Sequence, residues 1–165
     1  TEVDPNRPTR TSFAHYGATL GSFIDVYNQR TIGLQAIVDF VDPLQENAPI
    51  PFSELVSLGG NQRPMRGFLQ HRMLGRSSFV ASVEYSWPIW VFLDGVAHYS
   101  VGNVFGEHLG DFRGKKFRQS FGLGFRGNGS RDHAFEFLIG GGTETFEQGA
   151  ELESFRLVFG ATEGF

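Results

Sequence analysis

Apolar and polar residues alternate with a period of two along most of this 165-residue chain. The pattern is clearest in residues 117–126, where Phe121, Leu123 and Phe125 alternate with serine, glycine and arginine. Successive side chains of a β-strand point to opposite faces, so this period predicts strands with one apolar face. The 22 glycines and 18 phenylalanines agree, because glycine destabilises a helix by about 1 kcal/mol relative to alanine. The sequence therefore predicts an all-β, antiparallel fold without a helix of useful length.

About seven segments carry this alternation and are predicted to be strands. They are residues 10–24, 30–40, 79–87, 90–105, 117–126, 133–139 and 154–160. Most connections between them are short and rich in turn residues. The connection over residues 43–77 is far longer than a hairpin loop and reads as neither helix nor strand. A loop of this size in a compact β protein is usually functional or folded inward. We expect this one to fold inward.

Composition excludes several classes of protein. A net charge of −4 provides no basic face for nucleic acid. The absence of cysteine excludes disulfides and cysteine-ligated zinc. No apolar run approaches the roughly 20 residues that a transmembrane helix needs. The chain opens with TEVDPNRP, which is neither a starting methionine nor a secretory leader, so we expect an N-terminal part of the protein to be missing.

The chemistry of the two strand faces favours a membrane barrel over a soluble fold. One face is aromatic and aliphatic, while the other carries glycine, serine and charged residues. A membrane barrel places the apolar face outside and the polar face toward its lumen. Aromatic residues near the strand ends also fit interfacial girdles, namely Tyr85, Trp87, Trp90, Tyr99 and Phe105. A soluble β-sandwich that acts as a binding module is the alternative on pattern alone.

No motif indicates catalysis, a cofactor or a metal. Residues 122–127 match GxGxxG, but a dinucleotide site needs this motif to open a helix, whereas here it lies within a predicted strand. Small residues on the lumen face explain it better. The five histidines show no paired metal-ligand spacing, and no GxSxG elbow is present. Glu84 and Asp94 could form an acid/base pair, but nothing marks a substrate pocket beside them. We expect no enzymatic activity, cofactor or metal.

The long connection contains a glycine-flanked arginine that could form a buried ion cluster. Gly67 follows Arg66, and glycine permits backbone conformations that allow a tight fold. Glu84 and Asp94 each fall on the polar face of consecutive strands. A guanidinium directed into a polar cavity needs such carboxylates to offset its desolvation. A surface arginine, with the carboxylates paired to lysines, is the equally weighted alternative from these residues alone.

Several of these segments resemble one known family in the right order. Met65-Arg66-Gly67-Phe68 resembles the [VI]RG[FY] motif of the bacterial surface antigen family, which comprises outer-membrane assembly and secretion barrels. Residues 83–88 (VEYSWP) and 92–95 (FLDG) resemble the two strands that follow that motif. The end of the chain resembles the family's closing-strand signal through Phe155, Leu157, Phe159, Gly160 and Phe165. Met65 replaces the usual valine or isoleucine, and the chain runs slightly longer than usual before its final aromatic residue.

The resemblance implies a fold and a function. Residues 1–165 would be the C-terminal part of a transmembrane barrel of about sixteen strands, without a periplasmic POTRA repeat. Arg66, Gly67 and Phe68 would hold the loop in the lumen against Glu84 and Asp94. The implied activity is insertion of β-barrel clients, or movement of substrates across the outer membrane of a Gram-negative bacterium, through a lateral seam at the last strand.

The implied partners are outer-membrane lipid, client proteins and accessory lipoproteins. Unpaired strand edges in lipid cost several kcal/mol per group. We therefore expect the remaining strands to come from a longer protein, from further copies or from a partner chain. A passive barrel that anchors a missing N-terminal domain, such as a lipase, is the alternative function.

Overall fold

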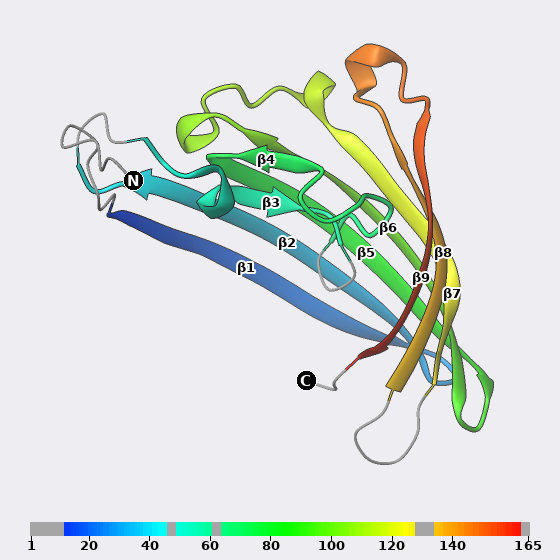
Figure 1. The fold of residues 1–165 in the computed structure, drawn as a ribbon. Helices are drawn as coiled ribbons and strands as arrows, with labels where there is room; N and C mark the ends of the chain where they lie inside the picture. The colour runs from blue at the N-terminus through cyan, green and yellow to red at the C-terminus, as the bar shows by residue number, and fades with distance from the viewer. Residues whose placement is uncertain (1–11, 46–48, 61–63, 128–133, 163–165) are drawn as a thin grey trace, which may run out of the picture.

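The computed structural model describes residues 12–45, 49–60, 64–127 and 134–162. Most of them belong to one seven-stranded sheet with the order β1-β2-β5-β6-β7-β8-β9 (Figure 1). The predicted all-β, antiparallel class is confirmed. No helix among the described residues has the length and apolar character needed to cross a bilayer.

Each predicted strand segment corresponds to one strand of this sheet. The strands are β1 Phe13–Val26, β2 Arg30–Pro43, β5 Ser77–Trp90, β6 Leu93–Phe105, β7 Arg118–Gly127, β8 Ala134–Thr143 and β9 Leu152–Thr162. The predicted boundary after Trp87 is wrong, because β5 continues through Pro88 to Trp90. The register with β6 shifts between Pro88 and Trp90, and such an irregularity tolerates a residue without an N–H group.

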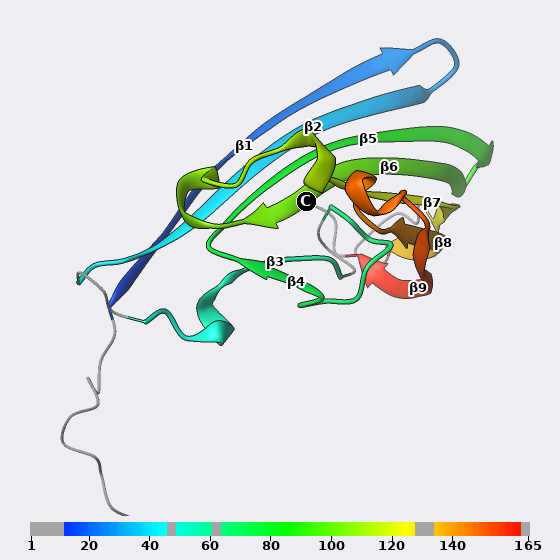
Figure 2. The ribbon, with the colours of Figure 1, turned by 90° about the horizontal axis from the view of Figure 1, so that it is seen from above.

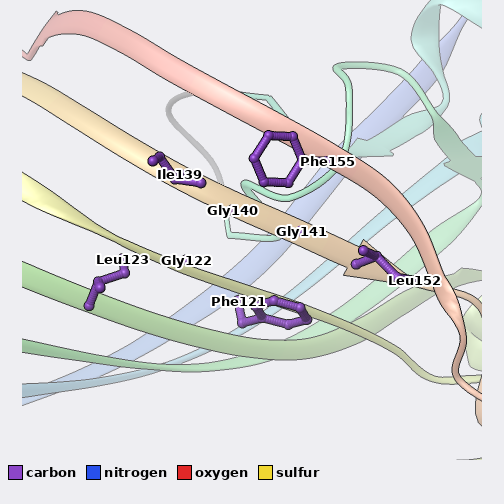
Figure 3. Close-up of a pocket in the computed structure, with 8 residues that line it drawn as sticks. All are labelled: Phe121, Gly122, Leu123, Ile139, Gly140, Gly141, Leu152 and Phe155. Atoms are coloured by element: carbon purple, nitrogen blue, oxygen red, sulfur yellow. The ribbon is translucent and has the colours of Figure 1, made fainter.

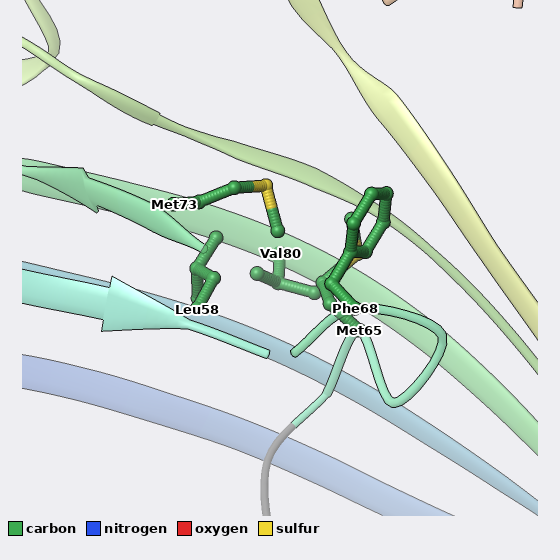
Figure 4. Close-up of a cluster of buried hydrophobic side chains, with 5 residues drawn as sticks. All are labelled: Leu58, Met65, Phe68, Met73 and Val80. Atoms are coloured by element: carbon green, nitrogen blue, oxygen red, sulfur yellow. The ribbon is translucent and has the colours of Figure 1, made fainter. Parts of the chain in front are cut away.

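The sheet is curved, and the connection between β2 and β5 lies on its concave side (Figure 2). This connection contains the short 3-10 turn η1 Phe52–Glu54 and a hairpin of β3 Val56–Leu58 with β4 Met73–Gly75. The prediction that the connection contains no strand is therefore wrong. Its buried apolar side chains pack onto β5 and form a small core (Figure 4). The members of this core are Leu58, Met65, Phe68, Met73 and Val80.

The two faces of the sheet differ as the alternation predicted. The convex face presents exposed apolar side chains, including Leu20, Leu123 and Leu157. The concave face carries small and polar residues, of which Ser100 and Ser120 are buried. Phe105 was expected in an exposed aromatic girdle, but only 4% of it is exposed, because Phe112 and Phe117 pack against its ring.

The sheet has two free edges and two different ends. Within the described residues, β1 pairs only with β2, β9 pairs only with β8, and no closed barrel forms. Tight turns join β1 to β2 and β5 to β6 at one end, and the longer connections lie at the other (Figure 1). A sandwich would need two large facing sheets, so the single seven-stranded sheet does not support that alternative.

Candidate functional site

The tripeptide Arg66-Gly67-Phe68 sits at the tip of the concave-side connection and lies against β7, β8 and β9. The backbone that leads to the tripeptide turns at three residues with positive φ, namely Gly59 (100°), Gly60 (103°) and Met65 (68°). The Gly60 N–H donates to the Phe68 carbonyl at 3.0 Å, and the Phe68 N–H donates to the Met65 carbonyl at 3.0 Å. These bonds close a compact turn, which presents the tripeptide to the sheet.

Arg66 and three charged side chains around it form what we call the inner ion cluster. Arg66 Nη1 lies 2.9 Å from Glu136 Oε1 and 3.5 Å from Glu84 Oε2. Arg126 Nη2 lies 3.1 Å from a carboxylate oxygen of each of the same two glutamates. Two positive charges thus alternate with two negative ones, so the cluster is neutral as a whole. Only 4% of the Glu136 side chain is exposed, and such burial requires this compensation.

The inner ion cluster contains Glu84, as the sequence suggested, but its other carboxylate is Glu136. Among the described residues, the salt bridges of Arg66 run to Glu84 and Glu136, whereas Asp94 lies opposite Arg126 in the β6–β7 register. The expected contribution of Asp94 to this cluster stays a prediction. The tip of the connection passes beyond β6 and rests on β8, and this position brings Arg66 close to Glu136. Alternation within residues 134–138 already placed Glu136 on the polar face, but nothing singled it out.

Gly67 is fixed by steric contact as well as by hydrogen bonds. A Cβ atom on Gly67 would lie 2.0 Å from the carbonyl oxygen of Gly141 and 2.8 Å from the nitrogen of Gly142. The Gly67 N–H donates to Ser120 Oγ at 2.8 Å, and Ser154 Oγ donates to the Gly67 carbonyl at 2.6 Å. The backbone of the tripeptide therefore lies flat against β8, with β7 and β9 bonded to it on either side.

Phe68 anchors the tripeptide through its ring. The side chain is fully buried, and the ring fills space above Gly142, where an added Cβ atom would come within 2.5 Å of it. The Arg118 guanidinium lies 6.0 Å from the ring centroid, at the limit of cation–π attraction. Arg118 also pairs with Glu153 on β9. Phe68 therefore requires glycine at position 142 of β8.

Side chains of β9 bind all three carbonyl groups of the tripeptide. Arg156 Nη1 donates to the carbonyls of Arg66 at 3.2 Å and of Phe68 at 2.5 Å, and Ser154 binds the carbonyl between them. The sequence reading missed Ser154 and Arg156, although both alternate with the closing-signal residues. Phe155, Leu157 and Phe159 of that signal are exposed, Gly160 lies within β9, and Phe165 lies outside the described residues.

The same connection also contacts the other edge of the sheet. His15 Nε2 of β1 lies 2.5 Å from the carbonyl oxygen of Glu54 in η1. The connection therefore spans the concave face from the first strand to the last. The residues between line a cavity of about 1100 Å³, with Arg66, Glu84 and Arg126 on its wall.

The glycine-rich run of β7 makes room for a buried histidine. Gly122 lies opposite His98 across β6 and β7, and a Cβ atom on it would come within 2.5 Å of the imidazole Cε1. His98 is 7% exposed, and its ring nitrogens have no hydrogen-bond partner among the described residues. The run lies inside a strand, so its small residues serve packing and do not form the helix N-terminus of a dinucleotide site.

A second group of charges, the rim ion cluster, joins β1 and β2 to the connection after β6. Its members are Tyr16, Asp42, Arg76, Glu107 and His108. His108 Nε2 lies 2.8 Å from Asp42 Oδ2, and Tyr16 Oη donates to the same oxygen at 2.5 Å. Arg76 pairs with Asp42 at 3.3 Å and with Glu107 at 3.0 Å. Ligand atoms of Asp42, Glu107 and His108 lie within 4.8 Å of one another, but Arg76 already supplies the positive charge that a cation would bring.

The convex face carries an apolar notch directly behind the tripeptide. It measures about 420 Å³ and opens above Gly140 and Gly141, between the rings of Phe121 and Phe155 (Figure 3). Because Gly67 touches Gly141 from the concave side, the wall here is only one backbone thick.

Together these features define an all-β sheet whose concave-side connection binds both edge strands. Comparison of the sequence with models of known protein families gave no match, and neither did comparison with curated proteins.

Proposed function

We propose that this chain forms part of a transmembrane β-barrel of the bacterial surface antigen type in a Gram-negative outer membrane. The convex apolar face supports this proposal, because a barrel in lipid turns such a face outward. The strands of the large sheet have 10 to 14 residues, and a tilted transmembrane strand needs about 9 to 11. The concave face is polar, as the lumen of such a barrel is, and the folded connection lies on it.

The proposed activity is insertion of β-barrel clients, or movement of substrates across the membrane, at a seam beside β9. Within the described residues, β9 has a backbone ladder on its β8 side only. Its other edge presents N–H and C=O groups that can bind an incoming strand by β-augmentation. The observation that carries this proposal is the set of bonds from Ser154 and Arg156 to the tripeptide carbonyls. Through these bonds the connection holds the strand that would have to move.

The inner ion cluster would keep the tripeptide seated while β9 moves. Arg66 is 19% exposed and its partner Glu136 is 4% exposed, so water compensates little if the pair separates. Glu84 lies on β5 and Glu136 on β8, so neither carboxylate belongs to β9. The connection can therefore stay attached to the fixed wall while its bonds to β9 break and re-form.

Replacement of Arg66 in the full-length protein tests this function. We expect Arg66→Ala to reduce client assembly or secretion and to speed amide hydrogen exchange in residues 64–70. Arg66→Lys is the matched variant, because it keeps the charge but loses the planar guanidinium. Faster exchange with unchanged assembly and secretion would indicate a passive anchoring barrel. If neither readout changes, the proposal fails.

A further inference from the structure

The apolar notch behind the tripeptide has a glycine floor between two aromatic residues. Gly141 of β8 lies opposite Phe121 of β7 and opposite Phe155 of β9, in one cross-strand row. A Cβ atom on Gly141 would lie 2.8 Å from Leu152 Cδ1 and 3.2 Å from Phe121 Cζ. Any side chain at this position would therefore begin to fill the space between the two rings (Figure 3). Glycine at position 141 keeps the notch open.

The lining of the notch offers no partner to a polar ligand. Its eight residues are all glycine or apolar, namely Phe121, Gly122, Leu123, Ile139, Gly140, Gly141, Leu152 and Phe155. The backbone of Gly140 and Gly141 belongs to β8, which is paired on both sides. A peptide segment in the notch would have to bury N–H and C=O groups without partners, which is unfavourable. A hydrocarbon chain carries no such groups.

The notch is a recess in a continuous apolar surface. Its volume of about 420 Å³ lies within the range of small-molecule sites, which is about 300 to 1,000 Å³. The apolar side chains around it remain exposed, from 42% for Ile139 to 67% for Phe155. Leu20 and Leu157, which do not line the notch, are exposed on the same convex face. What lies against this face therefore also reaches the notch.

We propose that the notch holds an acyl chain of a lipid from the surrounding bilayer. This inference rests on the proposed barrel, because the barrel turns the convex face toward lipid. Lipid chains are as apolar as the protein surface, so the preference must come from van der Waals packing. A chain in the notch contacts protein atoms on its floor and on both sides. A chain on the open convex surface contacts them on one side only.

The acyl chain and the tripeptide would lie on opposite sides of the same strand. Gly67 packs against the Gly141 carbonyl from the concave side, and the Phe68 ring packs over Gly142. A chain in the notch supports these glycines from the convex side and limits how far β8 can bend away from the tripeptide. Two events that favour the same position of β8 must favour each other. Lipid in the notch should therefore stabilise the seated tripeptide.

Photolabelling of the full-length protein in lipid vesicles tests the proposal. The probe is a phosphatidylcholine with a diazirine in one acyl chain, and mass spectrometry locates the labelled residues. Leu123 and Phe155 report on the notch. Leu20 and Leu157 are the matched controls, because they are similarly exposed on the same face. We expect the notch residues to be labelled several-fold more than the controls.

The pattern of labelling separates this proposal from the proposed barrel. Equal labelling of the notch and the controls would overturn the acyl-chain site, because it would indicate ordinary contact with lipid. Weaker labelling in the notch would also overturn it, since another part of a protein would then fill the space. Labelling of neither the notch nor the controls would instead contradict the proposed barrel itself.

Removal of one wall of the notch tests the link to the tripeptide. We expect Phe155→Ala to reduce the labelling of Leu123 several-fold and to speed amide exchange in residues 64–70. Leu157→Ala is the matched variant on the same strand and should change neither readout. Reduced labelling with unchanged exchange would show that lipid does not support the tripeptide. Unchanged labelling in a folded Phe155→Ala protein would contradict the site, and the labelling of the unsubstituted protein tests it independently.

Discussion

The inner and rim ion clusters have similar chemistry but very different surroundings. Each brings arginine together with two carboxylates, at comparable distances of 2.9 to 3.5 Å. In the inner cluster, Glu136 is 4% exposed, whereas Glu107 and His108 of the rim cluster are more than half exposed. Water and salt screen exposed pairs, which typically contribute less than about 1 kcal/mol. Distances alone therefore do not rank these pairs, and burial predicts that substitution of Glu136 has a larger effect than substitution of Glu107.

The largest effect is expected from Gly67→Ala, which tests whether the inner cluster depends on a seated tripeptide. The new methyl group would overlap backbone atoms of Gly141 at 2.0 Å, and a paired strand cannot move aside easily. We expect a loss of about 3 kcal/mol in the free energy of unfolding, measured by urea titration in detergent. Gly114→Ala near the rim is the control, because nothing lies within 4 Å of its added Cβ atom. Equal effects would show that the tripeptide is not packed on β8.

Glu136→Gln compares the two clusters directly. The neutral amide leaves Arg66 and Arg126 close together with one carboxylate fewer between them. We expect a loss of about 2 to 4 kcal/mol, against less than about 1 kcal/mol for Glu107→Gln at the rim. Both values come from the same urea titration. Similar losses for the two variants would remove the distinction between buried and exposed clusters.

Arg156→Ala should release β9 from the tripeptide while the inner ion cluster stays intact. Two hydrogen bonds to carbonyl groups are lost, which costs about 1 to 2 kcal/mol. Amide exchange should speed up in β9 more than in β3 and β4, as read by mass spectrometry. Arg156→Lys should restore part of the protection. Uniform acceleration across the whole connection would mean that the cluster does not hold the tripeptide independently.

The smallest effect concerns salt at the rim. At 1 M salt the screening length falls to about 3 Å, so the small destabilisation by Glu107→Gln should disappear. The effect of Glu136→Gln should stay nearly constant, because only 4% of the Glu136 side chain is exposed. Urea titrations at low and high salt provide the comparison. A loss of the Glu136→Gln effect in high salt would indicate that water reaches the inner cluster freely.

The sequence predicted the strands and their faces, because alternation is a local property. Glu84 was placed correctly on the concave face for the same reason. Glu136 and Arg156 could not be selected, since their role depends on which strands the tip of the connection reaches. That position is set by contacts such as Gly67 with Gly141, which no local pattern records. The prediction that Phe105 is exposed was wrong for a similar reason. Its burial under Phe112 depends on how the connection after β6 folds back.

The bonds between the tripeptide and β9 also set an order of events in folding. They join groups separated by 87 to 90 residues of chain, and contacts of such high sequence separation form slowly because a large loop must first close. The hairpins of the sheet join neighbouring segments and can form early. The connection can bind β9 only after that strand has been made and has paired with β8. We therefore expect its docking to be the last step of folding, completed only when the whole sheet is present.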